Sequence, residues 1–199
     1  GIMGAFLVLR TEAAFAIHDH DEQIILGIYY GIIAVMVFYN LFVFFSLRDR
    51  AYLSYVIMTL SIGFWFAWYN VVAKEYFWPD SSQEFWPGWR INVLVGFWNW
   101  VWILDFVRRF LHTRENAPRI HRLLSALMIF NVLLLAGVLL DQYRAFAPFV
   151  NLFWLLEWIL VLVTTIVVWR QDFRPARYLL IAWATMIGGV ILNLFFWMG

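Results

Sequence analysis

Residues 24–53 read IILGIYYGIIAVMVFYNLFVFFSLRDRAYL, and this stretch decides the fold. From Ile24 to Ser46 it contains no charged residue, and about 20 apolar residues are enough to cross a bilayer as a helix. The four residues Leu47-Arg48-Asp49-Arg50 then lead into a second apolar run, so we expect them to join two antiparallel helices. The stretch predicts an all-α integral membrane protein.

The composition of the whole chain agrees with this prediction. Hydrophobic residues make up 64% of the 199 residues and charged residues 14%, whereas a soluble domain has roughly 45–50% and about 25%. A chain this apolar would expose too much hydrophobic surface to remain in water. The absence of cysteine excludes disulfides and thiolate chemistry. The net charge of +1 identifies no partner, and no nucleic-acid partner is expected.

Six apolar segments are each long enough to span a hydrocarbon core of about 30 Å at a rise of 1.5 Å per residue. The six together predict a transmembrane helical bundle over residues 24–199. The segments are residues 24–46, 51–73, 91–108, 123–140, 148–169 and 178–198.

The basic residues separate between the two sets of loops. One side of the membrane would hold Arg48, Arg50, Arg108, Arg109, Arg114, Arg119, Arg122, Arg170, Arg174 and Arg177, which are ten of the 14 Lys and Arg residues. The other side would hold Arg10, Lys74, Arg90 and Arg144. Because basic residues in short loops stay cytoplasmic during insertion, the N-terminus is expected outside the cytoplasm, and so is Gly199 after six spans.

Several short motifs occur in a fixed order along the chain. They are Gly27-x-Tyr29-Tyr30-Gly31, Tyr39-Asn40-Leu41-Phe42, Arg48-Asp49-Arg50, Tyr76-Phe77-Trp78-Pro79 and Arg174-Pro175-Ala176-Arg177. In this order, over residues 14–199, the chain resembles the bacterial seven-transmembrane receptors with diverse intracellular signalling modules. The family pattern continues into a seventh helix and a signalling module, which are missing here after Gly199.

The resemblance implies a membrane core in the bacterial inner membrane that couples an outer sensor domain to a cytoplasmic output module of the histidine kinase or diguanylate cyclase type. Residues 1–23 would be the end of the sensor domain and a juxtamembrane linker, in which Thr11 is placed to cap a short helix. The implied partners are the bilayer, the chain's own sensor and output modules, and a second copy in a homodimer. An accessory subunit of a larger membrane complex and, less favoured, a transporter are the alternative functions.

No nucleophile–base pair, phosphate-binding loop or ligand cluster is evident, so this segment is not expected to be an enzyme or to bind a cofactor. His18-Asp19-His20-Asp21 has metal-binding residue types, but histidines two apart point away from each other on a helix. We therefore interpret these four residues as a solvated linker. Asp105 precedes Arg108 and Arg109 by three and four residues, which is the spacing of an intrahelical ion pair.

Glu157 lies at the centre of the fifth predicted span, where a carboxylate costs several kcal/mol unless it is paired or protonated. No Lys or Arg lies three or four residues away, but Asn131 and Asn99 are expected at a similar depth on other helices. Glu157 is either a buried switch or proton site, or a neutral residue that fixes helix packing through a hydrogen bond to one of these asparagines. Packing is the expected role.

Gly27 and Gly31 form a GxxxG face on the first predicted helix. Small residues four apart allow another helix backbone to approach closely. This face is therefore a candidate packing surface for a neighbouring helix.

Overall fold

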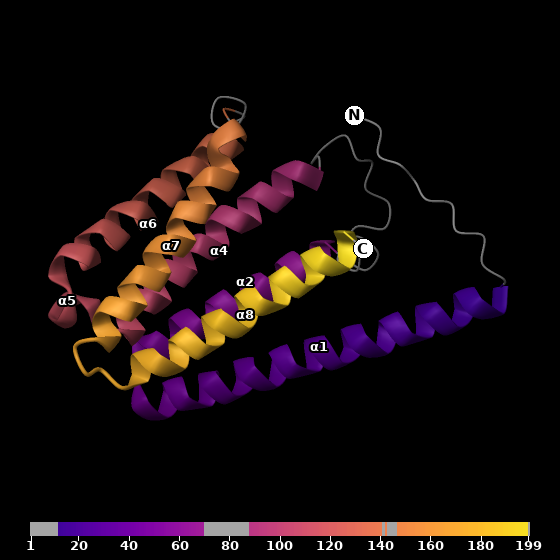
Figure 1. The fold of residues 1–199 in the computed structure, drawn as a ribbon, viewed down its shortest axis with the longest axis horizontal. Coiled ribbons are helices and arrows are strands. Elements are labelled where there is room, and N and C mark those ends of the chain that lie inside the picture. The colour runs from indigo at the N-terminus through magenta and orange to yellow at the C-terminus, as the bar shows by residue number, and fades with distance from the viewer. Residues whose placement is uncertain (1–11, 70–87, 141, 143–146, 199) are drawn as a thin grey trace.

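The computed structural model describes residues 12–69, 88–140, 142 and 147–198. Within these ranges the chain is built from helices and contains no strand, which confirms the all-α prediction (Figure 1). The helices are α1 (Glu12–Leu47), α2 (Arg50–Tyr69), α4 (Gly88–Phe110), α5 (Thr113–Asn116), α6 (Pro118–Leu139), the 3-10 helix η2 (Ala147–Phe149), α7 (Val150–Trp169) and α8 (Pro175–Met198).

A long helix occupies each of the six predicted spans. Among the described residues, four helical stretches are long and apolar enough to cross a membrane. They are Gln23–Leu47, Arg50–Trp68, Pro118–Leu139 and Ala147–Trp169. The chain is therefore a multi-pass membrane protein, while the count of six spans and the seventh helix after Gly199 stay predictions. Residues 70–73 of the second predicted span lie outside the described residues.

Helix α1 is one continuous helix of 36 residues. The lead-in that was expected to form a short helix of its own is part of α1 from Glu12 onward, while Thr11 lies outside the described residues. At 1.5 Å per residue, 36 residues extend about 54 Å, well beyond a hydrocarbon core of about 30 Å. The polar start of α1 thus continues the stretch Gln23–Leu47, which is long enough to span, as one unbroken helix.

A turn of two residues joins α1 to α2. Arg48 adopts the left-handed conformation with φ 58°, which ends α1. Asp49 then caps α2, because its Oδ1 accepts a hydrogen bond of 2.8 Å from the backbone N–H of Ala51. Arg48 and Asp49 thus form a tight hairpin turn within the expected four-residue connection, and Asp49 adds a cap that was not predicted.

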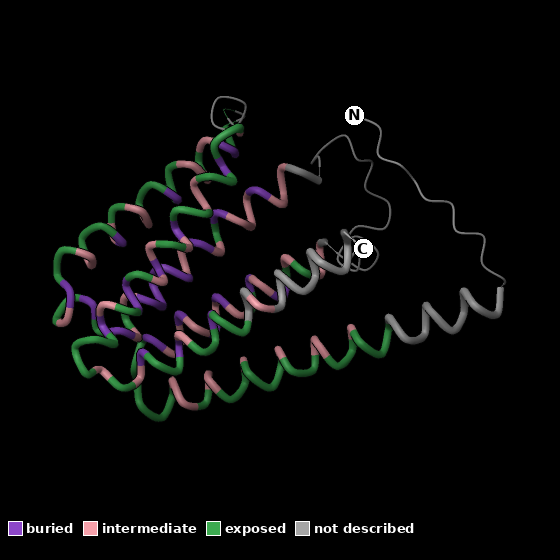
Figure 2. The backbone as a smooth tube through the Cα atoms, viewed as in Figure 1, coloured by how far each residue is buried: buried purple, intermediate pink, exposed green. Residues whose placement is uncertain are grey.

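The core lies between α2, α4, α6, α7 and α8, while α1 is largely exposed (Figure 2). In a membrane, helices gain little from hydrophobic burial against each other, so close fitting of side chains holds them together. Gly96 of α4 shows such a fit, since a Cβ atom placed there would lie 2.6 Å from Cζ2 of Trp154 on α7. The indole of Trp154 fills the space that the glycine leaves, with its ring 5.8 Å from the ring of Phe97.

The turns α1–α2, α4–α6 and α7–α8 lie at the same end of the bundle (Figure 1). The ten arginines on which the orientation prediction rests therefore belong to one face of the molecule. The opposite end holds the start of α4 and the end of α6.

We predict that Gly96→Ala destabilises the fold by about 1–3 kcal/mol, because its methyl group requires Trp154 and α7 to move. Thermal unfolding in detergent should show a lower midpoint. Gly188→Ala in α8 is the matched control, since a Cβ atom there meets nothing within 4 Å. Equal midpoints for the two variants would mean that α7 is not seated against Gly96.

We also predict that the arginine-rich end faces the cytoplasm. Since the chain has no native cysteine, Asp49→Cys and Gln142→Cys report on opposite ends without background labelling. In intact cells a membrane-impermeant maleimide should label position 142 and spare position 49 until the membrane is permeabilised. Labelling of position 49 from outside would reverse the orientation.

Candidate functional site

Glu157 of α7 and Asn131 of α6 form a buried polar contact between two helices. Their exposed fractions are 1% and 0%. Asn131 Nδ2 donates to Glu157 Oε1 at 2.5 Å and to the backbone carbonyl of Leu127, one turn earlier on α6, at 2.9 Å. The amide of Asn131 thus ties the side chain of Glu157 to the backbone of α6.

The other side-chain oxygens of the pair, Glu157 Oε2 and Asn131 Oδ1, are also buried, and neither has a hydrogen-bond partner among the described residues. If Glu157 were ionised, its Oε2 would be a buried acceptor without a donor, at a cost of several kcal/mol in hydrocarbon. A proton on Oε2 would instead supply a donor, and Asn131 Oδ1 is an unused acceptor on the residue already bonded. The contacts therefore favour a neutral acid paired with an amide.

Asn99 of α4 was the other expected partner of Glu157. It is half-buried, and its Oδ1 has no hydrogen-bond partner in the described part of the chain, so of the two asparagines it is Asn131 that bonds Glu157. The residue after Glu157 on α7 is Trp158, whose ring lies 5.0 Å from that of Trp100 on α4 and 4.9 Å from that of Trp183 on α8. Trp158 thus packs α7 against α4 and α8.

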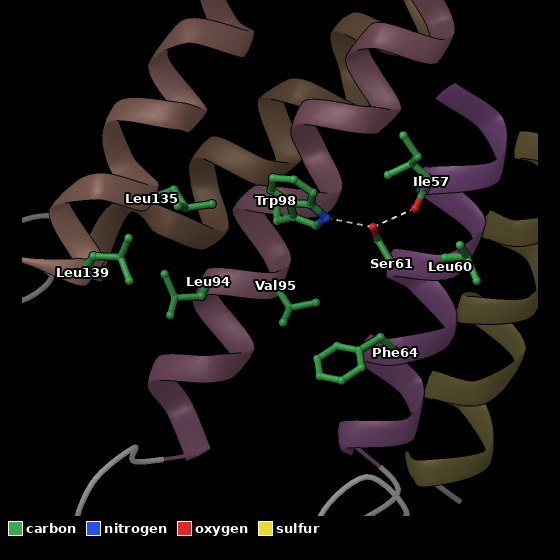
Figure 3. A pocket seen from close by; sticks show the side chains of 9 residues that line it. All are labelled: Ile57, Leu60, Ser61, Phe64, Leu94, Val95, Trp98, Leu135 and Leu139. Carbon is green, nitrogen blue, oxygen red and sulfur yellow. Dashed lines mark hydrogen bonds between the residues drawn. The ribbon is translucent and has the colours of Figure 1, made fainter. Parts of the chain in front are cut away.

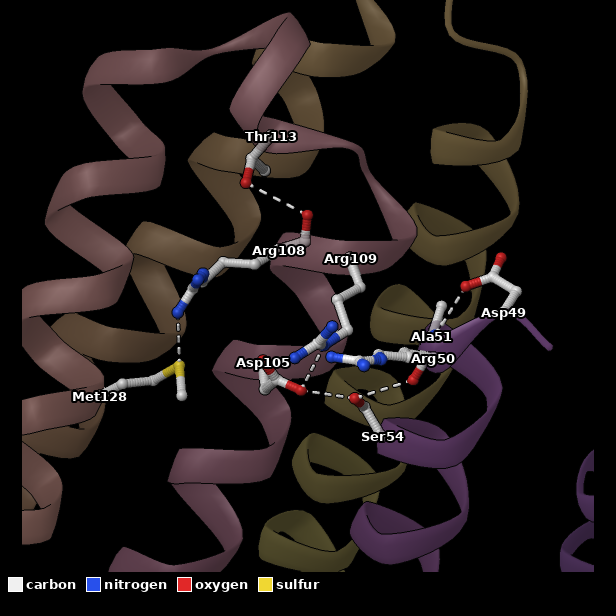
Figure 4. Close-up of polar contacts among 9 residues, drawn as sticks. All are labelled: Asp49, Arg50, Ala51, Ser54, Asp105, Arg108, Arg109, Thr113 and Met128. Carbon is white, nitrogen blue, oxygen red and sulfur yellow. Dashed lines mark hydrogen bonds and ion pairs between the residues drawn. The ribbon is translucent and has the colours of Figure 1, made fainter. Parts of the chain in front are cut away.

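A second polar cluster lies at the arginine-rich end (Figure 4). Asp105 of α4, with 5% of its surface exposed, accepts hydrogen bonds from Ser54 Oγ of α2 at 2.5 Å and from Arg109 Nε at 2.7 Å. The predicted ion pair forms with Arg109, while the Nη1 of Arg108 points to Met128 Sδ of α6 at 2.9 Å. Ser54 lies 51 residues before Asp105, so spacing along one helix could not reveal this contact.

An apolar groove of about 510 Å³ lies between α2, α4 and α6 (Figure 3). The polar atoms of its lining are paired with each other, because Trp98 Nε1 donates to Ser61 Oγ at 3.0 Å and Ser61 Oγ donates to the carbonyl of Ile57 at 2.7 Å. The groove therefore offers apolar side chains to its surroundings. Its lining gives no indication of a polar ligand.

Gly27 and Gly31 are exposed on α1, and a Cβ atom at either position would meet nothing within 4 Å. No described part of the chain packs on this face. A helix that packs there would have to come from elsewhere, so the packing role stays a prediction.

The other motif positions have local structural contacts where the structure describes them. The ring of Tyr29 lies 5.2 Å from that of Tyr30 and 5.4 Å from that of Phe66 on α2. Asn40 Nδ2 donates to the carbonyl of Met36 at 2.7 Å, and Tyr39 is exposed. Pro79 and the side chains of residues 18–21 lie outside the described residues, whereas Pro175 and Arg177 lie in the first turn of α8 and Arg174 directly precedes that helix.

We predict that Glu157→Gln leaves the fold nearly as stable as the parent, because glutamine keeps the shape and a carbonyl that accepts from Asn131. Asn131→Leu should cost about 1–3 kcal/mol, since it leaves the acid buried without a donor. Thermal unfolding in detergent measures both effects. The infrared carbonyl band of a protonated carboxylic acid should be present in the parent and reduced in Glu157→Gln. Failure of Glu157→Gln to assemble would mean that the charge itself is required.

Comparison with known proteins adds one finding to this geometry. A family model described as "7TM diverse intracellular signalling" matches residues 22–199, which include all of the helices from the transmembrane part of α1 to the end of α8. No curated protein and no solved structure matches the chain.

Proposed function

The chain belongs to the family of seven-transmembrane proteins with diverse intracellular signalling, and we propose on this basis that it is the signal-transducing membrane core of a bacterial receptor. The membrane domain of this family is a receptor-like domain and is not itself catalytic. In our proposal it lies in the inner membrane with its N-terminus outside the cytoplasm. It couples an extracytoplasmic sensor domain to a cytoplasmic output module of the histidine kinase or diguanylate cyclase type.

The observation that supports coupling is the continuity of α1. The helix extends without interruption from Glu12, outside the predicted span, to Leu47 at the other end of the bundle. A displacement or rotation applied at its outer end is transmitted along the helix axis, because each backbone hydrogen bond links one turn to the next. Helix α1 is therefore suited to be the input element.

The short turn between α1 and α2 makes these two helices one unit. With two residues between Leu47 and Arg50, α1 cannot shift without moving the start of α2. Ser54 of α2 is in turn bonded to Asp105 of α4. This contact connects the α1–α2 hairpin to the rest of the bundle at its arginine-rich end.

Signalling requires two arrangements whose balance an outside event changes. In our proposal the exposed face around Gly27 and Gly31 packs differently in the two arrangements, against a second copy in a homodimer. The output leaves through the seventh helix toward the cytoplasmic module.

We predict that Gly27→Leu with Gly31→Leu, in the full-length receptor, shifts basal output while membrane insertion stays intact. Each leucine adds bulk on a face where two backbones are expected to approach. Ala126→Leu with Ala136→Leu is the matched control, because it adds the same kind of bulk to exposed positions of α6. The measurement is the activity of the output module with and without stimulus, at equal expression. Output that matches the parent in both conditions would exclude this face as a coupling surface.

A further inference from the structure

The turn between α7 and α8 carries two arginines that the proposed signalling mechanism leaves without a role. Arg174 lies directly before Pro175, the first residue of α8, and Arg177 lies within the first turn of that helix. Both side chains are exposed. They belong to the motif Arg174-Pro175-Ala176-Arg177, which is part of the resemblance to the receptor family.

The backbone of this turn is held in a defined shape. Asp172 adopts the left-handed conformation with φ 63°, and its N–H donates to the carbonyl of Trp169 at 3.1 Å. Ala176 is fully buried, and the ring of Phe173 lies 5.6 Å from that of His112 in the neighbouring α4–α6 turn. Because Phe173 and Ala176 anchor the turn inward, the polar side chains around them are directed to the outside in a fixed arrangement.

These polar side chains surround a cavity of about 200 Å³, lined by Trp169, Asp172, Arg174 and Arg177. Two guanidinium groups and one carboxylate give the cavity a formal charge of +1. The positive end of the α8 helix dipole adds to this potential. The cavity is thus matched in charge to a group with one negative charge.

The two arginines differ in their present contacts. Arg177 Nη2 donates to the hydroxyl of Tyr178 at 2.7 Å, and its guanidinium lies 4.7 Å from the centre of the tyrosine ring. This contact holds one guanidinium at the rim and leaves its other N–H groups available. Arg174 makes no side-chain hydrogen bond or ion pair with any residue that the structure describes, so no described residue occupies the N–H groups of its guanidinium.

The position of the cavity identifies the source of the anion. It lies at the end of the bundle where the arginine-rich turns gather (Figure 1). The ends of membrane-spanning helices are expected at the level of the lipid headgroups. Trp169 and Tyr178 are 49% and 59% exposed beside it, and tryptophan and tyrosine favour the headgroup level of a bilayer. Phospholipid phosphates lie at this level.

We propose that the α7–α8 turn is a binding site for a single anionic phospholipid. Arg174 and Arg177 donate hydrogen bonds to the oxygens of its phosphodiester, a contact that the planar guanidinium makes with two N–H groups at once. Trp169 packs against the glycerol and the first part of the acyl chains. Asp172 accepts a hydrogen bond from a headgroup hydroxyl and disfavours a free phosphate dianion by repulsion. The site would fix the α7–α8 hairpin relative to the membrane surface.

The test is native mass spectrometry of the full-length protein in detergent, with phosphatidylglycerol or phosphatidylcholine added at equal concentration. The parent should retain one phosphatidylglycerol in clear preference to phosphatidylcholine. Arg174→Gln with Arg177→Gln should weaken this retention by about 30-fold, from roughly 5-fold for each basic residue near an anionic lipid. Arg119→Gln with Arg122→Gln is the matched control, because it removes the same charge from exposed positions of α6 that do not line this cavity. Since electrostatic attraction falls off with distance from the bound lipid, this control should change retention by less than about 3-fold.

Three results would overturn the proposal. The first is equal retention of the two lipids by the parent, and the second is an equal loss in the two double variants. The third is displacement of phosphatidylglycerol by inorganic phosphate, which would make the cavity a site for soluble anions. Arg174→Lys keeps the charge without the planar fork, so a partial loss is expected from it and full retention would exclude bidentate binding. None of these measurements depends on the signalling function.

Discussion

The structure depends on the requirement that every backbone N–H and C=O inside hydrocarbon be bonded within the chain. This requirement makes each apolar segment a helix, and it confines irregular backbone to the ends of the bundle. The left-handed residues Arg48, His112 and Asp172, which are the described non-glycine residues with positive φ, all lie in turns at the arginine-rich end. Because these turns are tight, only a few backbone groups at the helix ends need to be capped by water or side chains.

Since lipid is as apolar as the helices, the bundle is held by fit and by a few polar contacts. Two of these contacts involve a buried acidic side chain, and they lie at different depths. Asp105 with Ser54 joins α4 to α2 at the arginine-rich end, and Glu157 with Asn131 joins α7 to α6 within the apolar part of the bundle. Loss of a hydrogen bond costs more free energy at the Glu157–Asn131 contact than at the Asp105–Ser54 contact, because no water can replace the lost partner within the apolar part of the bundle. Helix α7 therefore has a more strictly defined neighbour than α1, which makes no comparable buried contact among the described residues.

Much of the fold follows from sequence features that act locally. Apolar segments of sufficient length predict the helices, and the four residues Leu47-Arg48-Asp49-Arg50 between two such segments predict the first turn. The cap of α2 by Asp49 became visible only in the structure. The choice of Asn131 over Asn99 by Glu157 could not be predicted, because both asparagines have the same chemistry and a similar expected depth. The bond between Ser54 and Asp105 could not be predicted either, because it depends on how α2 and α4 are rotated about their own axes. Gly96 gave no signal in the sequence either, because its role becomes visible only with the indole of Trp154 beside it.

The unbroken course of α1 also sets a rule for how the chain can be joined to other modules. In a helix each added residue turns whatever precedes it by about 100° and lifts it by about 1.5 Å. One extra residue in the lead-in of α1 would point a preceding domain in a different direction, whereas seven extra residues would return it to within about 20° of its original direction. The number of helical residues before the first span therefore sets the direction in which a preceding domain points. Fusions of such a domain to α1 that keep this direction should differ in length by whole heptads.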